Sequence, residues 1–172
     1  MDKEIKQQRK FSRTMIIAMW ALIIAMLSMY FHNILQRDRN PNQDVVTSQS
    51  SDGAREVILQ RNNNGHYLAT GKINDQPVTF FLDTGATDIS IPKKIAERIG
   101  LRKGQRVIYS TANGPATNYL TELDSVSLGN IRLHNLRASI NPNINSDEVL
   151  LGMSFLKHLE FSQKGKILTI RQ

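Results

Sequence analysis

One segment limits what this 172-residue chain can fold into more than any other: Phe80-Phe81-Leu82-Asp83-Thr84-Gly85-Ala86. It begins as an apolar run typical of a buried strand, and the run delivers one carboxylate into a tight Thr-Gly turn. Burying an ionised acid is costly unless the surroundings stabilise its charge. Asp83 is therefore expected to be either a structural residue that caps the turn or a catalytic group.

The sequence around this segment has the pattern of a small all-β domain. Short apolar stretches separated by turn sequences predict strands. Pro92 and Gly100 bracket a predicted short helix over 93–99, and a second helix is expected over 154–159. The predicted class is all-β with one or two short helices, over a length that can hold one small core. The expected strands are 56–59, 67–73, 78–82, 88–91, 106–111, 118–128, 131–140 and 166–170.

The N-terminal part has the composition of a membrane anchor. The run from Met15 to Phe31 contains no charged residue and is close to the minimum length that spans a bilayer as a helix. Tyr30 lies near one end, where an interfacial aromatic side chain is favoured. A cleaved signal peptide is the alternative, but no small-x-small cleavage site follows the run. We therefore predict a transmembrane helix.

The flanking charges predict the orientation of this helix. The basic cluster before it outweighs the two arginines after it, which favours a cytoplasmic N-terminus, a single pass through the inner (cytoplasmic) membrane, and a domain in the periplasm or its equivalent. Much of the +7 net charge thus belongs to membrane topology, and no nucleic-acid partner is expected. The predicted divisions are a cytoplasmic basic tail (1–14), a transmembrane helix (15–31), a flexible tether (32–55) and the all-β domain (56–172).

A second motif lies far downstream, where the apolar run Val149-Leu150-Leu151 leads into Gly152 and the second predicted helix. The pairing of this run with the Asp-Thr-Gly-Ala motif resembles the retropepsin-like aspartic proteases, and most closely their membrane-anchored bacterial branch. The resemblance covers about residues 56–172 and implies a single-lobe acid-protease fold. It implies that Asp83 is the catalytic aspartate. The supporting loop would be Thr84, Gly85 and Ala86, with an apolar bracket of Leu150, Leu151 and Gly152 beneath it.

The mechanism of aspartic proteases requires two carboxylates, one ionised to activate water and one protonated to polarise the scissile carbonyl. This chain carries one Asp-Thr-Gly and has about half the length of a two-lobed enzyme. We therefore expect a homodimer in which Asp83 faces Asp83 of the partner subunit. The expected partners are a second copy of the chain, a peptide or protein substrate, and the lipid bilayer. Strand 166–170 is a candidate for pairing across the dimer, as terminal strands do in retropepsins.

Residues 109–117 fit a hairpin flap that closes over substrate, with Asn113, Gly114 and Pro115 at its tip. An ordinary surface hairpin is the alternative interpretation. Retroviral members usually carry an aspartate after the Ala and an arginine after the downstream Gly, and these two form an ion pair. This chain has Thr87 and Met153 there, so both charges are absent together.

The remaining polar residues give weaker hypotheses. Asp88 is interpreted as a solvated acid at a strand end, and the alternative is a part in holding the substrate backbone near Thr87 and Met153. The four histidines have no metal-ligand spacing and the chain has no cysteine, so neither a metal nor another cofactor is expected. The alternative to a peptidase is a non-catalytic module that uses the same fold to bind peptide or to dimerise near the membrane.

Overall fold

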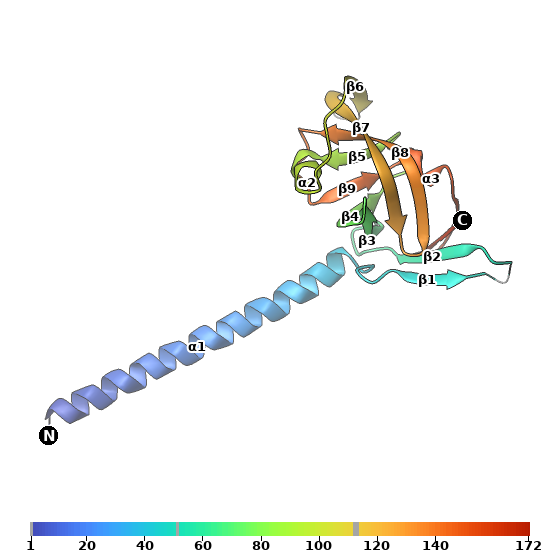
Figure 1. Cartoon of the computed structure of the whole chain (residues 1–172). Coiled ribbons are helices and arrows are strands. Elements are labelled where there is room, and N and C mark those ends of the chain that lie inside the picture. Colours follow the sequence, from blue (N-terminus) through green and yellow to red (C-terminus); the bar gives the residue numbers. More distant parts are fainter. Residues whose placement is uncertain (1, 51, 112–113) are drawn as a thin grey trace. The chain divides into compact units, whose positions relative to one another are not determined.

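A computed structural model describes residues 2–50, 52–111 and 114–172, in two units, Met1–Asp38 and Arg39–Gln172 (Figure 1). The first unit is a single helix, α1 (Asp2–Arg39). Its segment from Thr14 to Arg39 is long and apolar enough to cross a membrane. Large apolar side chains along it, such as Ile17, Leu22 and Met29, are exposed, as the lipid-facing side chains of an anchor would be.

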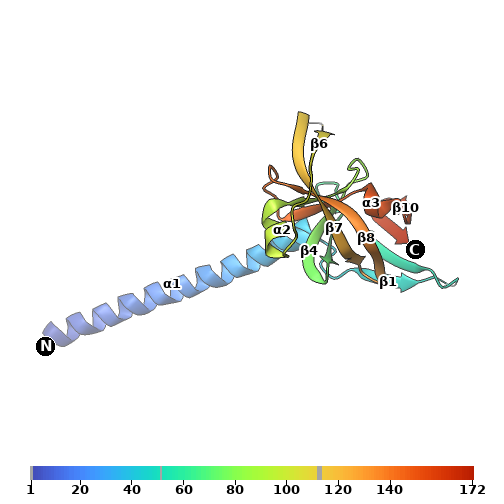
Figure 2. The ribbon, with the colours of Figure 1, turned by 45° about the horizontal axis from the view of Figure 1, so that its top comes forward.

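The second unit is a β-domain of two sheets, which confirms the predicted class (Figures 1 and 2). The four-stranded sheet is antiparallel, in the order β1 (Val46–Gln49), β2 (Arg55–Gln60), β11 (Ile167–Arg171), β10 (Glu160–Lys164). The seven-stranded sheet has the order β3 (Leu68–Ile73), β4 (Gln76–Leu82), β9 (Glu148–Leu151), β5 (Ile89–Pro92), β8 (Ile131–Asn141), β7 (Gly114–Leu128), β6 (Arg106–Thr111). The two short helices are α2 (Lys93–Arg98) and α3 (Met153–Leu156).

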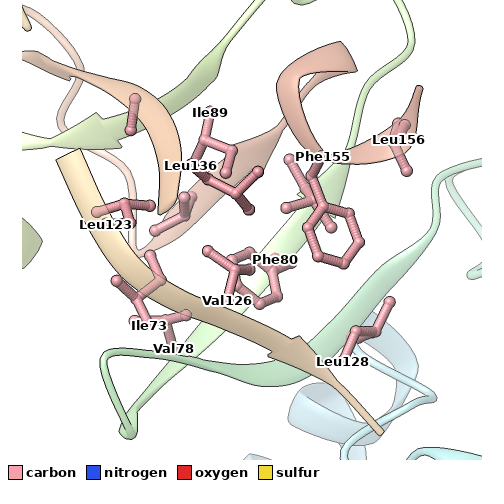
Figure 3. Packing of buried hydrophobic residues seen from close by; sticks show 14 of the residues in the cluster. Ile73, Val78, Phe80, Ile89, Leu123, Val126, Leu128, Leu136, Phe155 and Leu156 are labelled. Carbon is pink, nitrogen blue, oxygen red and sulfur yellow. The ribbon is translucent and has the colours of Figure 1, made fainter. Parts of the chain in front are cut away.

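The core forms because strands of the large sheet turn alternate side chains inward and α3 covers them. Phe80, Val126 and Phe155 are fully buried in one apolar cluster (Figure 3). Gly71 permits this packing, since a Cβ there would lie 2.5 Å from a ring carbon of Phe80. β3, at one end of the large sheet, also pairs with β7, the strand next to the other end.

The segment expected to be a flexible tether is ordered for much of its length, which corrects that expectation. α1 continues to Arg39, and Val46–Gln49 forms β1 against β2. Hydrogen bonds hold this segment in place, because the buried Asn42 side chain bonds to backbone groups of both β2 and the start of β3. A polar segment can therefore be fixed by hydrogen bonds although it buries little apolar surface.

The expectation for the C-terminal strand is also wrong. β11 is flanked on one edge by β2 and on the other by β10, both from the same chain. Both rows of backbone hydrogen-bonding groups are thus occupied, and β11 has no edge left for a partner.

Candidate active site

Two parallel strands bring the two sequence motifs together. β4 and β9 pair with Phe81 opposite Leu150 and Leu82 opposite Leu151, so both strands end at the same edge of the sheet. The Asp83 amide donates a hydrogen bond to the Leu151 carbonyl at 3.2 Å. Residues 83–88, here called the Asp83 loop, therefore leave the sheet directly beside Gly152.

The Asp83 side chain shapes its own turn. Its Oδ1 accepts a hydrogen bond from the Gly85 amide at 2.9 Å, and its carbonyl accepts one from the Ala86 amide at 3.2 Å. This is the arrangement in which an Asx side chain stabilises a tight turn. Asp83 is half-buried, whereas Thr84 and Gly85 are exposed. The loop thus presents an oriented carboxylate next to exposed residues.

The end of β9 and the first turn of α3 hold the loop from the other side. A Cβ at Gly152 would lie 2.5 Å from the Ala86 carbonyl oxygen and comparably close to that of Asp88, so only glycine fits there. The Met153 amide donates to the Ala86 carbonyl at 2.8 Å, and the Ser154 amide to the Thr87 carbonyl at 3.0 Å. Leu151 is buried and Leu150 half-buried beneath these contacts. The loop is therefore fixed by backbone bonds over an apolar base.

Asp88 is not a solvated acid, which corrects the sequence interpretation. Its side chain is 8% exposed, and its Oδ2 accepts hydrogen bonds from Arg137 Nε at 3.2 Å and Nη2 at 3.1 Å. The Tyr109 hydroxyl donates to the same oxygen. A carboxylate–arginine pair thus lies at the end of the Asp83 loop, with the acid one residue after Thr87 and the arginine supplied by β8. Sequence reasoning missed Tyr109 and Arg137 as partners of Asp88, because both lie far from Asp88 along the chain.

This cluster joins the β6–β7 hairpin to the Asp83 loop, since Tyr109 lies on β6 and Arg137 on β8. Burial, and then the bond to Asp88, raises the pKa of Tyr109, so its hydroxyl stays protonated as a donor. Hydrogen bonding of the Arg137 guanidinium with Tyr109, and then with Asp88, raises the pKa of Arg137.

The hairpin itself stands out from the body of the domain (Figure 2). Register pairs run from Arg106 with Tyr119 to Thr111 with Gly114. Of the three residues predicted at its tip, Asn113 lies outside the described residues. Gly114 and Pro115 begin β7, and Gly114 has a φ of +97°, a conformation that favours glycine.

Two further features of the described part of the chain concern ligands. No group of three His, Cys, Asp or Glu side chains there is arranged to hold a metal ion. A surface cavity of about 430 Å³ lies elsewhere, bordered by residues such as Val78, Lys94 and Arg98. Within the Asp83 loop, Thr84, Gly85 and Thr87 are exposed.

Comparison with known proteins identifies the family. Residues 69–158 match the family described as gag-polyprotein putative aspartyl protease, which is just over half of the chain. The chain belongs to this aspartyl protease family. Its retropepsin-like fold is similar to the crystal structure of a retropepsin-like aspartic protease from Rickettsia conorii, with a TM-score of 0.58 and 27% identity over 74% of this chain and 95% of that one.

Two curated proteins are similar to this chain over most of its length. A Sinorhizobium sp protein, described as uncharacterized and located in the cobV 5' region, is 33% identical over 159 residues, which cover 86% of this chain and 68% of the relative. The uncharacterized protein RP867 of Rickettsia prowazekii (strain Madrid E) is 28% identical over 161 residues, 90% of this chain and 69% of the relative.

Proposed function

We propose that this protein is a membrane-anchored aspartic endopeptidase that is active as a homodimer, with Asp83 of each subunit supplying one of two catalytic carboxylates. The observation that carries the proposal is the setting of Asp83. Its carboxylate is oriented by the Gly85 amide at 2.9 Å, on a loop fixed against Gly152, in a chain of the aspartyl protease family. One such carboxylate is half of the required pair.

In the dimer, the two Asp83 carboxyl groups share one proton, because two adjacent like charges cannot both ionise. The ionised group accepts a proton from a water molecule, whose oxygen attacks the carbonyl carbon of the scissile peptide bond. The protonated group donates a hydrogen bond to the carbonyl oxygen and stabilises the charge that develops there. Collapse of the tetrahedral intermediate breaks the C–N bond, and the amine nitrogen takes up a proton as it leaves.

Other residues of the loop and hairpin have supporting roles in this proposal. Thr84 is exposed beside Asp83, where its hydroxyl can contact the loop of the partner subunit. Gly85 and Ala86 shape the turn, and Leu150, Leu151 and Gly152 form its base. The β6–β7 hairpin, including Asn113, Gly114 and Pro115, closes over bound peptide and excludes water.

The proposed location follows from the N-terminal helix. Residues 15–31 cross the inner membrane, the basic residues 1–14 remain in the cytoplasm, and the protease domain faces the periplasm or its equivalent. Anchoring two copies in one membrane confines them to a thin layer and raises their effective concentration. The membrane therefore favours formation of the active dimer.

The test is Asp83→Asn in the full chain in detergent micelles, with cleavage of an unfolded protein measured at mildly acidic pH. Asp124→Asn is the matched control, because Asp124 is exposed on β7 and the chemical change is the same. We expect Asp83→Asn to abolish cleavage with an unchanged thermal unfolding profile, and Asp124→Asn to retain both. Equal cleavage by Asp83→Asn and the parent would refute the assignment, and peptide binding without cleavage by the parent would favour a non-catalytic binding module.

A further inference from the structure

Within the described part of the chain, β10 is an uncovered edge strand. It pairs with β11 on one side, and all five of its residues are exposed. Phe161 in its middle is 51% exposed, although it is a large apolar side chain. An uncovered strand edge offers unpaired backbone groups to another strand, and monomeric proteins usually protect such edges. β10 thus has the properties of a strand that is completed by another chain.

The opposite edge of the same sheet is protected. β1 packs against the turn between β7 and β8, where a Cβ added at Gly129 would lie 2.6 Å from a methyl carbon of Thr47. The Asn130 side chain in that turn donates a hydrogen bond to the Ser48 carbonyl at 3.1 Å. Because β11 has both edges occupied, β10 is the strand of this sheet that is available for pairing.

The sequence of β10, Glu-Phe-Ser-Gln-Lys, is complementary to itself. When two copies pair antiparallel over their full length, the two-fold axis passes at Ser162. Glu160 then lies opposite Lys164 of the partner subunit, and Lys164 opposite the partner's Glu160. Neither side chain has an ion pair within the described residues of its own chain. Opposite charges at directly facing positions stabilise such a pair of strands.

We propose that two copies of this chain dimerise by antiparallel pairing of β10 with β10 of the partner subunit, in the register centred on Ser162. The inference rests on the proposed function, which needs a second carboxylate from another copy. β10 suits that need because three residues separate it from α3, whose first turn holds the Asp83 loop through the Ala86 and Thr87 carbonyls. Pairing through β10 therefore fixes the partner close to the element that positions Asp83.

The first experiment introduces a single cysteine, because the natural chain has none. In the proposed register Ser162 faces the partner's Ser162, and facing residues of antiparallel strands lie within the Cα separation that a disulfide spans. Oxidation of full-length Ser162→Cys in detergent micelles should give a covalent dimer. Val46→Cys is the matched control, since Val46 is 60% exposed on the opposite edge strand, and it should stay monomeric on a denaturing gel. Equal cross-linking of both variants, or none by Ser162→Cys, would overturn the proposal.

The second experiment reverses the charges. Glu160→Lys places two lysines opposite each other in the dimer, and Lys164→Glu places two glutamates opposite each other. Each variant alone should dissociate at roughly tenfold higher protein concentration than the parent. A mixture of the two restores both opposite-charge pairs and should regain parental dimerisation, measured by sedimentation. Failure of the mixture to regain it would refute the register.

These outcomes separate the inference from the proposed function. If cross-linking and charge restoration succeed while the parent cleaves no peptide, the β10 interface stands and the peptidase assignment fails. If the parent cleaves peptide in a manner that depends on Asp83 while the β10 variants dimerise normally, the peptidase stands and the β10 interface is wrong.

Discussion

Substitution of Asn42 by alanine tests whether the segment after the N-terminal helix is an integral part of the domain. Asn42 is 4% exposed. Its Nδ2 donates to the Gln60 carbonyl at 2.9 Å and to the Leu68 carbonyl at 2.6 Å, and its Oδ1 accepts from the Gln60 amide at 2.6 Å. One side chain thus connects β2 of the small sheet to β3 of the large sheet.

The structure gives the size of the expected effect. Alanine removes three hydrogen bonds and leaves one amide and two carbonyl groups without their partner. A buried polar group that loses its partner costs about 1–3 kcal/mol, and water can reach part of this site because Gln60 is exposed. We therefore expect a loss of about 3 kcal/mol in the free energy of unfolding. In a domain of this size that loss lowers the melting temperature by ~10 °C.

The measurement is thermal and urea unfolding of the full chain in detergent micelles, followed by near-ultraviolet circular dichroism. Asn63→Ala is the control, because Asn63 is exposed in the turn after β2 and the same side-chain amide is removed. Its stability should stay within about 0.5 kcal/mol of the parent, as is usual for surface positions. If Asn42→Ala is as stable as Asn63→Ala, Asn42 does not fix this segment to the domain, and the flexible tether expected from the sequence is the better description.

Two further predictions concern the surroundings of the Asp83 loop. Because the pKa of Tyr109 is raised from its usual 10.0, the stabilisation from its neutral hydroxyl is present below that pH and is lost as the pH rises through the folded-state value. The melting temperature of the parent should therefore fall above about pH 10, and Tyr109→Phe should reduce this pH dependence. Identical plots of melting temperature against alkaline pH for the two proteins would contradict the prediction. Gly152→Ala should cost about 2–4 kcal/mol in urea unfolding and slow cleavage, because its Cβ would clash with the Ala86 and Asp88 carbonyls; unchanged stability would show that the loop yields easily.

Most strands of the large sheet could be predicted from the sequence, because their apolar residues recur at regular spacing. β7 and β8 lie close to their predicted bounds, and α2 begins directly after Pro92 as expected. β1 and β10 were missed, since Val-Thr-Ser-Gln and Glu-Phe-Ser-Gln-Lys carry too few apolar residues to signal a strand. Their strand conformation comes from backbone pairing with distant segments, which local sequence does not encode.

The site was predictable to the extent that its parts lie within motifs. Asp83 was expected to lie near Gly152, because the two motifs that contain these residues occur together in one family. The parallel pairing of β4 with β9 places the two motifs side by side. The partners of Asp88 were not predictable, because Tyr109 and Arg137 lie 21 and 49 residues further along the chain. The joint absence of charge at Thr87 and Met153 was the available signal, since it raised the question of where another ion pair lies.

The two corrections in the small sheet bear on how the enzyme would be switched on. Four strands of one chain, β1, β2, β11 and β10, form this sheet, and both edges of β11 are paired without a partner. The domain can thus satisfy the backbone of β11 and bury Leu168 and Ile170 as a monomer. The carboxylate pair, in contrast, is complete in the proposed dimer alone. Folding and activation are then separate steps, because the first depends on contacts within the chain and the second on the local concentration of β10 edges. A membrane that concentrates the anchored chains would control the second step without affecting the first.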